Sequence, residues 1–169
     1  LYGTRIEFIK KLSKQQQFQH KVEIFGYNWS VKELSDMYKG TLGGFNFGTS
    51  NTIEKLLPNT TKWDALEKYS YSIAIENSCK RNYFTEKFTD CILSWTMPIY
   101  YGCPNIADYF PKDCYYWLDI TADNCFEELE RILNTPITNK QISAIAQARE
   151  LILNKYHIYD VVHTIIDRD

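Results

Sequence analysis

The chain has 169 residues, 44% of them hydrophobic, which suits one ordinary globular domain with a sizeable core. Its 19 basic and 21 acidic residues nearly balance, which argues against a broad nucleic-acid-binding surface. No run of residues approaches the roughly 18 consecutive apolar positions that a membrane-spanning helix requires. The chain begins at Leu1 rather than at a methionine, and we expect it to be a fragment of a longer protein.

The first part of the chain is predicted to hold one helix, one short strand and a long irregular stretch. Apolar residues recur at helical spacing over residues 4–16, where Thr4 is a candidate N-cap. Residues 21–26 predict a short strand that ends in glycine. Residues 27–61 are rich in Gly, Asn, Thr and Ser and predict loops and short pieces, and residues 63–69 predict a short helix.

The second part of the chain alternates predicted strands with predicted helices. Strands are expected over residues 71–76, 97–102 and 115–120, and helices over 85–95, 126–134, 139–155 and the last residues through 166. Strands separated by helices of about ten residues imply βαβ units, so the fold class is α/β with a mostly parallel sheet. Neither an internal repeat nor a low-complexity linker is visible, and residues 1–169 are predicted to form a single domain.

Parallel sheets bind ligands beyond the carboxyl ends of their strands, which draws attention to the segment after Glu76. The helix predicted to open at Thr85 would attract phosphate, because the N–H groups at a helix start are unpaired and carry partial positive charge. Lys87 adds a full charge there, although a cation in a first turn is mildly unfavourable for stability. Glu86 is suited to accept hydrogen bonds from ribose hydroxyls. The alternative is a well-capped helix start with a solvated lysine, but the joint position of these residues after a strand favours a ligand site.

Cysteines and histidines give no clear metal-binding signal. The five cysteines lie 11 or 12 residues apart and never form a CxxC pair, so we expect reduced, mostly buried thiols. The segment Gly43–Gly48 resembles a phosphate loop only faintly, because it lacks a preceding strand and the usual lysine. The histidines are scattered, and neither catalysis nor metal binding is predicted for them: His20, His157 and His163.

Two segments resemble the signature of the α1,3/4-fucosyltransferase family, which is glycosyltransferase family 10. Residues 68–78 read KYSYSIAIENS and residues 82–87 read NYFTEK, whereas the family pattern is K-Y-x-F-x-x-x-F-E-N-S followed by D-Y-x-T-E-K. The departures are mild: Tyr71 and Ile75 stand where phenylalanine is usual, and Asn82 where aspartate is common. The following P-I-Y-Y-G and Y-F-P segments are also similar to family segments, so the resemblance is strong up to residue 120. It is looser near the amino end, where an arginine-containing helix precedes a strand.

The resemblance implies a GT-B enzyme with two Rossmann-like halves, of which this chain is the carboxy-terminal, donor-binding half. The donor substrate is then GDP-fucose, and the acceptor is a hydroxyl of a glycan. The family's donor-binding positions fall on Arg5, Asn77, Tyr83, Glu86 and Lys87. The resemblance assigns the diphosphate to Arg5 and Lys87, the ribose to Glu86, and the phosphate and sugar region to Asn77 and Tyr83. For Arg5, a solvated helix arginine is an equal alternative.

The resemblance also implies inverting transfer, in which a general base deprotonates the acceptor. In the family this base is a carboxylate of the amino-terminal acceptor domain, which is expected to be absent here, so no catalytic base is assigned. Glu76 is interpreted as a structural or donor-orienting residue. Asp119 and Asp123 have the wrong spacing for an Asp-x-Asp metal motif, so neither a metal nor another cofactor is expected.

The expected partners are the sugar-nucleotide donor, the glycan acceptor and the amino-terminal domain of the same enzyme, with no nucleic acid. The cysteine pattern favours a bacterial cytoplasmic enzyme, with membrane contact only peripheral, over one in the Golgi lumen. Two other functions stay open: an enzyme of the same architecture that uses another nucleotide sugar, and a non-catalytic domain that binds a sugar nucleotide or a protein.

Overall fold

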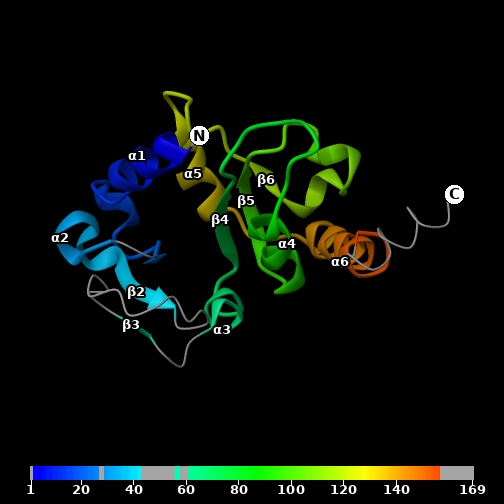
Figure 1. The fold of residues 1–169 in the computed structure, drawn as a ribbon, viewed down its shortest axis with the longest axis horizontal. Coiled ribbons are helices and arrows are strands. Elements are labelled where there is room, and N and C mark those ends of the chain that lie inside the picture. The colour runs from blue at the N-terminus through cyan, green and yellow to red at the C-terminus, as the bar shows by residue number, and fades with distance from the viewer. Residues whose placement is uncertain (1, 27–28, 43–55, 58–60, 157–169) are drawn as a thin grey trace, which may run out of the picture.

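The computed structural model describes residues 2–26, 29–42, 56–57 and 61–156 (Figure 1). The glycine-rich segment 43–48, the helix expected at the carboxy end through residue 166, and His157 and His163 lie outside the described residues.

The described part of the chain alternates strands with helices, as Figure 1 shows. The strands are β1 (Ile24–Phe25), β2 (Tyr38–Leu42), β3 (Leu56–Leu57), β4 (Tyr71–Ile75), β5 (Met97–Tyr101) and β6 (Tyr116–Trp117). The α-helices are α1 (Tyr2–Leu12), α2 (Val31–Leu34), α3 (Lys62–Leu66), α4 (Glu86–Leu93), α5 (Cys125–Leu133) and α6 (Asn139–Asn154).

Every strand pair in the described residues is parallel, which confirms the predicted α/β class. One sheet has the order β1-β2-β3 and the other β4-β5-β6. Among the described residues no strand pair joins β1 to β4, so these are two separate three-stranded sheets. Tyr69, just before β4, links the two sheets, because its ring contacts Phe25 of β1 and its hydroxyl donates to Glu23.

Each face of the β4-β5-β6 sheet is covered by its own pair of helices. Ile75, Ile99 and Tyr101 pack in one cluster with buried residues of α1 and α5, whereas Ala74 and Tyr100 pack in a second cluster with α4 and α6. Neighbouring strand residues point to opposite faces, so both faces are buried and β5 is apolar throughout. Figure 1 shows α1 and α5 on one side of these strands and α4 and α6 on the other.

Strand lengths differ from the prediction, and two strands of the first half, β2 and β3, were not predicted. Helix α1 starts before Thr4, which therefore lies in the first turn rather than at the cap. Strands β1 and β6 have two residues each, shorter than expected. Strand β2 was not predicted, because Gly40 interrupts its β-forming residues. Gly40 has a φ of 123° beside a register shift between Ile24 and Phe25, and glycine suits such a bulge.

We predict that Gly102→Ala lowers the free energy of unfolding by about 1–3 kcal/mol, because the site just after β5 has no room for a methyl group. A Cβ there would lie 2.7 Å from the Cβ of Glu76 and 2.8 Å from the hydroxyl of Tyr100. Urea unfolding measures the change. The matched control is Gly3→Ala in helix α1, where a Cβ meets nothing within 4 Å. It should be neutral or stabilising by ~0.5–1 kcal/mol, and equal stability of both variants would contradict the packing argument.

Candidate functional site

The predicted site lies where strand β4 ends and helix α4 begins. Asn77 follows the last residue of β4 by two positions, and Thr85 is the N-cap of α4, as predicted. Glu86 and Lys87 therefore occupy the first turn of an eight-residue helix. The start of a helix carries partial positive charge, which favours an anionic ligand.

Glu76 joins the end of β4 to the start of α4. Its side chain is completely buried, and its carboxylate accepts hydrogen bonds from the Thr85 N–H at 2.8 Å and the Thr85 hydroxyl at 2.7 Å. The buried Tyr100 hydroxyl lies 3.5 Å from the same carboxylate. A buried carboxylate is costly unless such hydrogen bonds satisfy it. Because Glu76 is inaccessible to solvent, it is suited to bracing the site and not to deprotonating an incoming acceptor.

The Thr85 hydroxyl links Glu76 to Lys87 through hydrogen bonds. A hydroxyl has one donor and two acceptor positions, and all three are used here. It donates to Glu76, and it accepts from the Lys87 N–H at 3.4 Å and from the Lys87 ammonium at 3.2 Å. The buried carboxylate thus orients the hydroxyl whose lone pairs hold the lysine at the helix start.

Glu86 and Lys87 form an ion pair within this first turn. The Lys87 ammonium lies 2.9 Å from the Glu86 carboxylate. Partial burial raises the pKa of Glu86, but the hydrogen bond and positive charge of Lys87 outweigh it and hold the pKa below the usual glutamate value. Glu86 is therefore ionised at neutral pH and available as a hydrogen-bond acceptor. The first turn presents one cation and one anion side by side.

Arg5 reaches the site from the first turn of helix α1. Its guanidinium donates to the side-chain oxygen of Asn77 at 2.8 Å, across 72 positions of sequence, and lies 3.5 Å from the carbonyl oxygen of Ile75. The ring of Tyr2 lies 5.1 Å from the guanidinium carbon and supports it by a cation–π contact. The fold thus places the side chain of Arg5 at the carboxyl end of β4.

Tyr83 lies in the loop that joins Asn77 to the start of α4. It is half-buried, and its N–H donates to the carbonyl of Lys80 at 3.3 Å. Among the described residues, no hydrogen bond joins Tyr83 to the other four predicted site residues. The structure therefore pairs Arg5 with Asn77 and Glu86 with Lys87, and leaves Tyr83 in the connection between them.

Sequence reasoning missed the residue that holds this loop in place, which is Asn105. Its side chain exchanges hydrogen bonds with the backbone and side chain of Asn82 at 2.9 and 2.8 Å, and the Tyr109 hydroxyl donates to Asn82 at 2.7 Å. Asn82 has a φ of 61°, a conformation that asparagine and aspartate tolerate best. Its side-chain oxygen accepts both of these side-chain bonds, and an aspartate would accept them equally. This explains why asparagine can replace the family's aspartate here.

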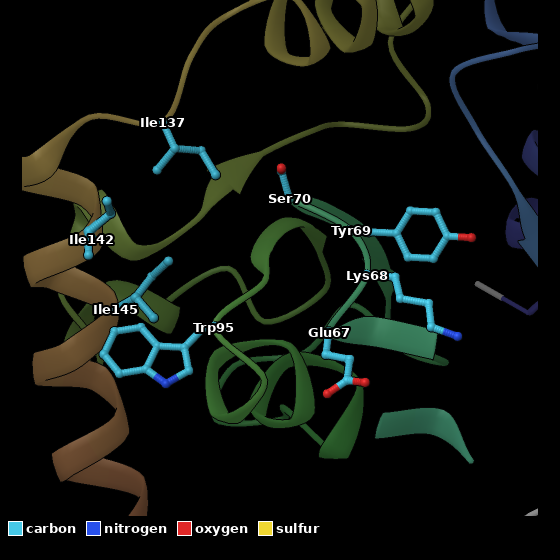
Figure 2. Close-up of a pocket in the computed structure, with 8 residues that line it drawn as sticks. All are labelled: Glu67, Lys68, Tyr69, Ser70, Trp95, Ile137, Ile142 and Ile145. Atoms are coloured by element: carbon cyan, nitrogen blue, oxygen red, sulfur yellow. The ribbon is translucent and has the colours of Figure 1, made fainter. Parts of the chain in front are cut away.

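A hollow of about 320 Å³ lies at the opposite end of the sheet, near the amino end of β4. Figure 2 shows its wall of Trp95, Ile142 and Ile145, while the side chains of Lys68 and Tyr69 point away from the isoleucines. The charged residues that line this hollow are the oppositely charged Glu67 and Lys68, so it lacks the converging positive charges that a phosphate needs. It is therefore not the candidate donor site.

The five cysteines are free thiols, and four of them are buried. Cys91, Cys103, Cys114 and Cys125 are buried free thiols, Cys79 is exposed, and burial raises the pKa of Cys91 to about 11. Across the described ranges, no cluster of three or more His, Cys, Asp or Glu side chains could hold a metal ion. None of the helices in that part of the chain is long and apolar enough to cross a membrane.

Comparison with known families agrees with the resemblance seen in the signature segments. Residues 3–141 match the family described as glycosyltransferase family 10 (fucosyltransferase), C-terminal part. The chain belongs to this family. The match covers both Arg5 and the signature segments.

Known relatives are considerably longer than this chain. The α-(1,3)-fucosyltransferase B of Drosophila melanogaster is 29% identical over 114 residues, which are 56% of this chain and 24% of that protein. The α-(1,3)-fucosyltransferase FucT of Helicobacter pylori is 40% identical over 52 residues, which are 30% of this chain and 11% of that protein. The chain spans no more than about a quarter of the length of these relatives.

Solved α1,3-fucosyltransferase structures are also similar to the chain. One crystal structure with GDP-fucose is 21% identical with a TM-score of 0.39, and it covers 64% of this chain and 39% of its own. A crystal structure with GDP is 23% identical with the same TM-score of 0.39, and covers 64% of this chain and 40% of its own.

We predict that Thr85→Val destabilises the protein by about 1–3 kcal/mol, because it removes the N-cap of α4 and the hydroxyl that donates to Oε2 of the buried Glu76 carboxylate. Valine keeps the β-branched shape, so the hydroxyl is the main loss. Thr85→Ser retains the hydroxyl and is the control. Chemical denaturation measures both variants, and a Val variant as stable as the Ser variant would contradict the bracing role of Glu76.

Proposed function

We propose that this chain is the donor-binding domain of an inverting fucosyltransferase, which transfers fucose from GDP-fucose to a hydroxyl group of a glycan. One observation carries the proposal: Arg5, Lys87 and the start of α4 gather around the carboxyl end of β4. Two cations and a helix N-terminus at this edge of a parallel sheet suit a diphosphate. Membership of the fucosyltransferase family supports the choice of donor.

The proposal gives each residue of the site a part in donor binding. Lys87 and Arg5 hold the diphosphate, and Glu86 accepts hydrogen bonds from the ribose hydroxyls. Asn77 and Tyr83 line the phosphate and sugar region. The arrangement supports this division, because Glu86 is the exposed member of its ion pair and Lys87 lies deeper, with 61% and 24% of their side chains exposed.

The same residues would lower the barrier to transfer. As the bond from fucose to phosphate breaks, negative charge grows on the departing GDP. Arg5, Lys87 and the first turn of α4 stabilise that charge without rearranging, because they are held in place before the reaction. In this proposal these groups make GDP a better leaving group, and no metal is needed for that purpose.

The acceptor side of the reaction is assigned to another part of the enzyme. Glu76, the one carboxylate in the signature that sits at the end of β4, is buried and engaged by Thr85. We therefore place the general base and the glycan acceptor site in an amino-terminal domain. The greater length of the relatives supports this division. Free, mostly buried thiols favour a cytoplasmic enzyme over one in the Golgi lumen.

We expect calorimetric titration to show binding of GDP and GDP-fucose, and Lys87→Ala to weaken GDP binding by about 1.5–3 kcal/mol, the usual contribution of a charged hydrogen-bond partner. Lys140→Ala is the control, because Lys140 is an exposed lysine that pairs with Asp113 on the surface. Competition with UDP and ADP tests the choice of nucleotide. Unchanged GDP affinity in Lys87→Ala, or stronger binding of UDP or ADP, would contradict the donor assignment.

We expect the 169-residue chain to bind GDP-fucose yet release little GDP when glycan acceptors are added, since the proposed base lies outside it. Coupled detection of GDP release measures this, with a full-length family member as the positive control. Robust transfer by the chain alone would show that it contains its own base, and would contradict the assignment of the base to an amino-terminal domain.

A further inference from the structure

We propose that the Glu86–Lys87 ion pair makes recognition of ribose and recognition of diphosphate interdependent, so that the site favours ligands carrying both groups side by side. This inference rests on the proposed donor site and concerns how that site selects its ligand.

In the structure the charged groups of Glu86 and Lys87 pair with each other. The Lys87 ammonium lies 2.9 Å from Glu86 and 3.2 Å from the Thr85 hydroxyl. The residue proposed to bind phosphate is thus paired with the residue proposed to bind ribose. Because Thr85 is itself held by the buried Glu76, the lysine keeps one fixed partner when it leaves the other.

A ligand that has phosphates but no ribose is disfavoured at this site by the negative charge of Glu86. A phosphate that binds Lys87 competes with Glu86 for the ammonium, and the Glu86 carboxylate then stands beside the ligand's negative charge. A nucleoside alone has the opposite effect, since it engages Glu86 and leaves Lys87 without its counter-ion. A ligand with only one of the two groups therefore gains one set of contacts but weakens the attraction between Glu86 and Lys87.

A nucleoside diphosphate replaces both halves of the ion pair at once. Its phosphate takes the place of Glu86 at the ammonium, and its ribose hydroxyls take the place of Lys87 at the carboxylate. The ion pair is broken once and two sets of contacts form, so each moiety strengthens the binding of the other. This is a coupling between two neighbouring subsites, and it is reciprocal by thermodynamic necessity.

The hydrogen bond between Arg5 and Asn77 does not couple two subsites in this way. Its partner Asn77 is neutral, so a phosphate that displaces Asn77 leaves no like charge beside it. The coupling is consequently specific to the first turn of α4, and removing the charge of Glu86 alone should abolish it.

The test compares pyrophosphate and GDP binding to the wild-type chain, to Glu86→Gln and to Glu128→Gln at constant salt. Glu128→Gln removes the same charge from another exposed ion pair, with Arg131 on helix α5. Pyrophosphate is measured by displacement of GDP. We expect Glu86→Gln to bind pyrophosphate about two- to five-fold more tightly, the range for an exposed ion pair, and to bind GDP more weakly. Glu128→Gln should leave both affinities unchanged.

The outcomes separate the two proposals. If the wild-type chain does not bind GDP, the donor site itself is wrong. If it binds GDP but Glu86→Gln binds pyrophosphate no more tightly than wild type, the donor site stands and the coupling is overturned. Glu86 is exposed and the Thr85 cap is retained, and equal thermal unfolding of the three proteins confirms that the fold is unchanged.

Discussion

The buried carboxylate of Glu76 is the contact on which the rest of the site depends. It ties the end of β4 to the first residue before α4 through two hydrogen bonds to Thr85. Thr85 in turn caps the helix and holds Lys87. The tight fit of Gly102 against Glu76 closes the space on the β5 side. A charged group can be buried in this way only because each of its partners is already placed by a strand or a helix.

The sheet arrangement explains why distant residues meet at this point. Helix α1 packs on one face of β4-β5-β6 and α4 on the other, and the first turns of both lie at the carboxyl end of β4. Parallel sheets with helices on both faces bring helix starts to this edge, because each helix runs back against the strands. Arg5 and Lys87, far apart in sequence, thereby converge on one anionic ligand in the proposed site.

The second half of the chain could be predicted well from sequence, and the first half less so. Strands β4 and β5 and helices α4, α5 and α6 carry clear periodicity and a recognisable cap at Thr85. Strand β2 escaped prediction because Gly40 sits within it and its place depends on pairing with β1. Asn105 was missed for a similar reason, since its role depends on Asn82, a partner 23 positions away.

The sequence by itself determined the family, the fold class and the identity of the candidate donor residues, because these are carried by short motifs and by local periodicity. Tertiary structure alone decided that Glu76 is buried, that Arg5 contacts Asn77, and that Glu86 and Lys87 neutralise each other. The physical reason is that burial and charge pairing are properties of the space between elements. A motif names the side chains, but only packing sets which of them water can reach and which of them face one another.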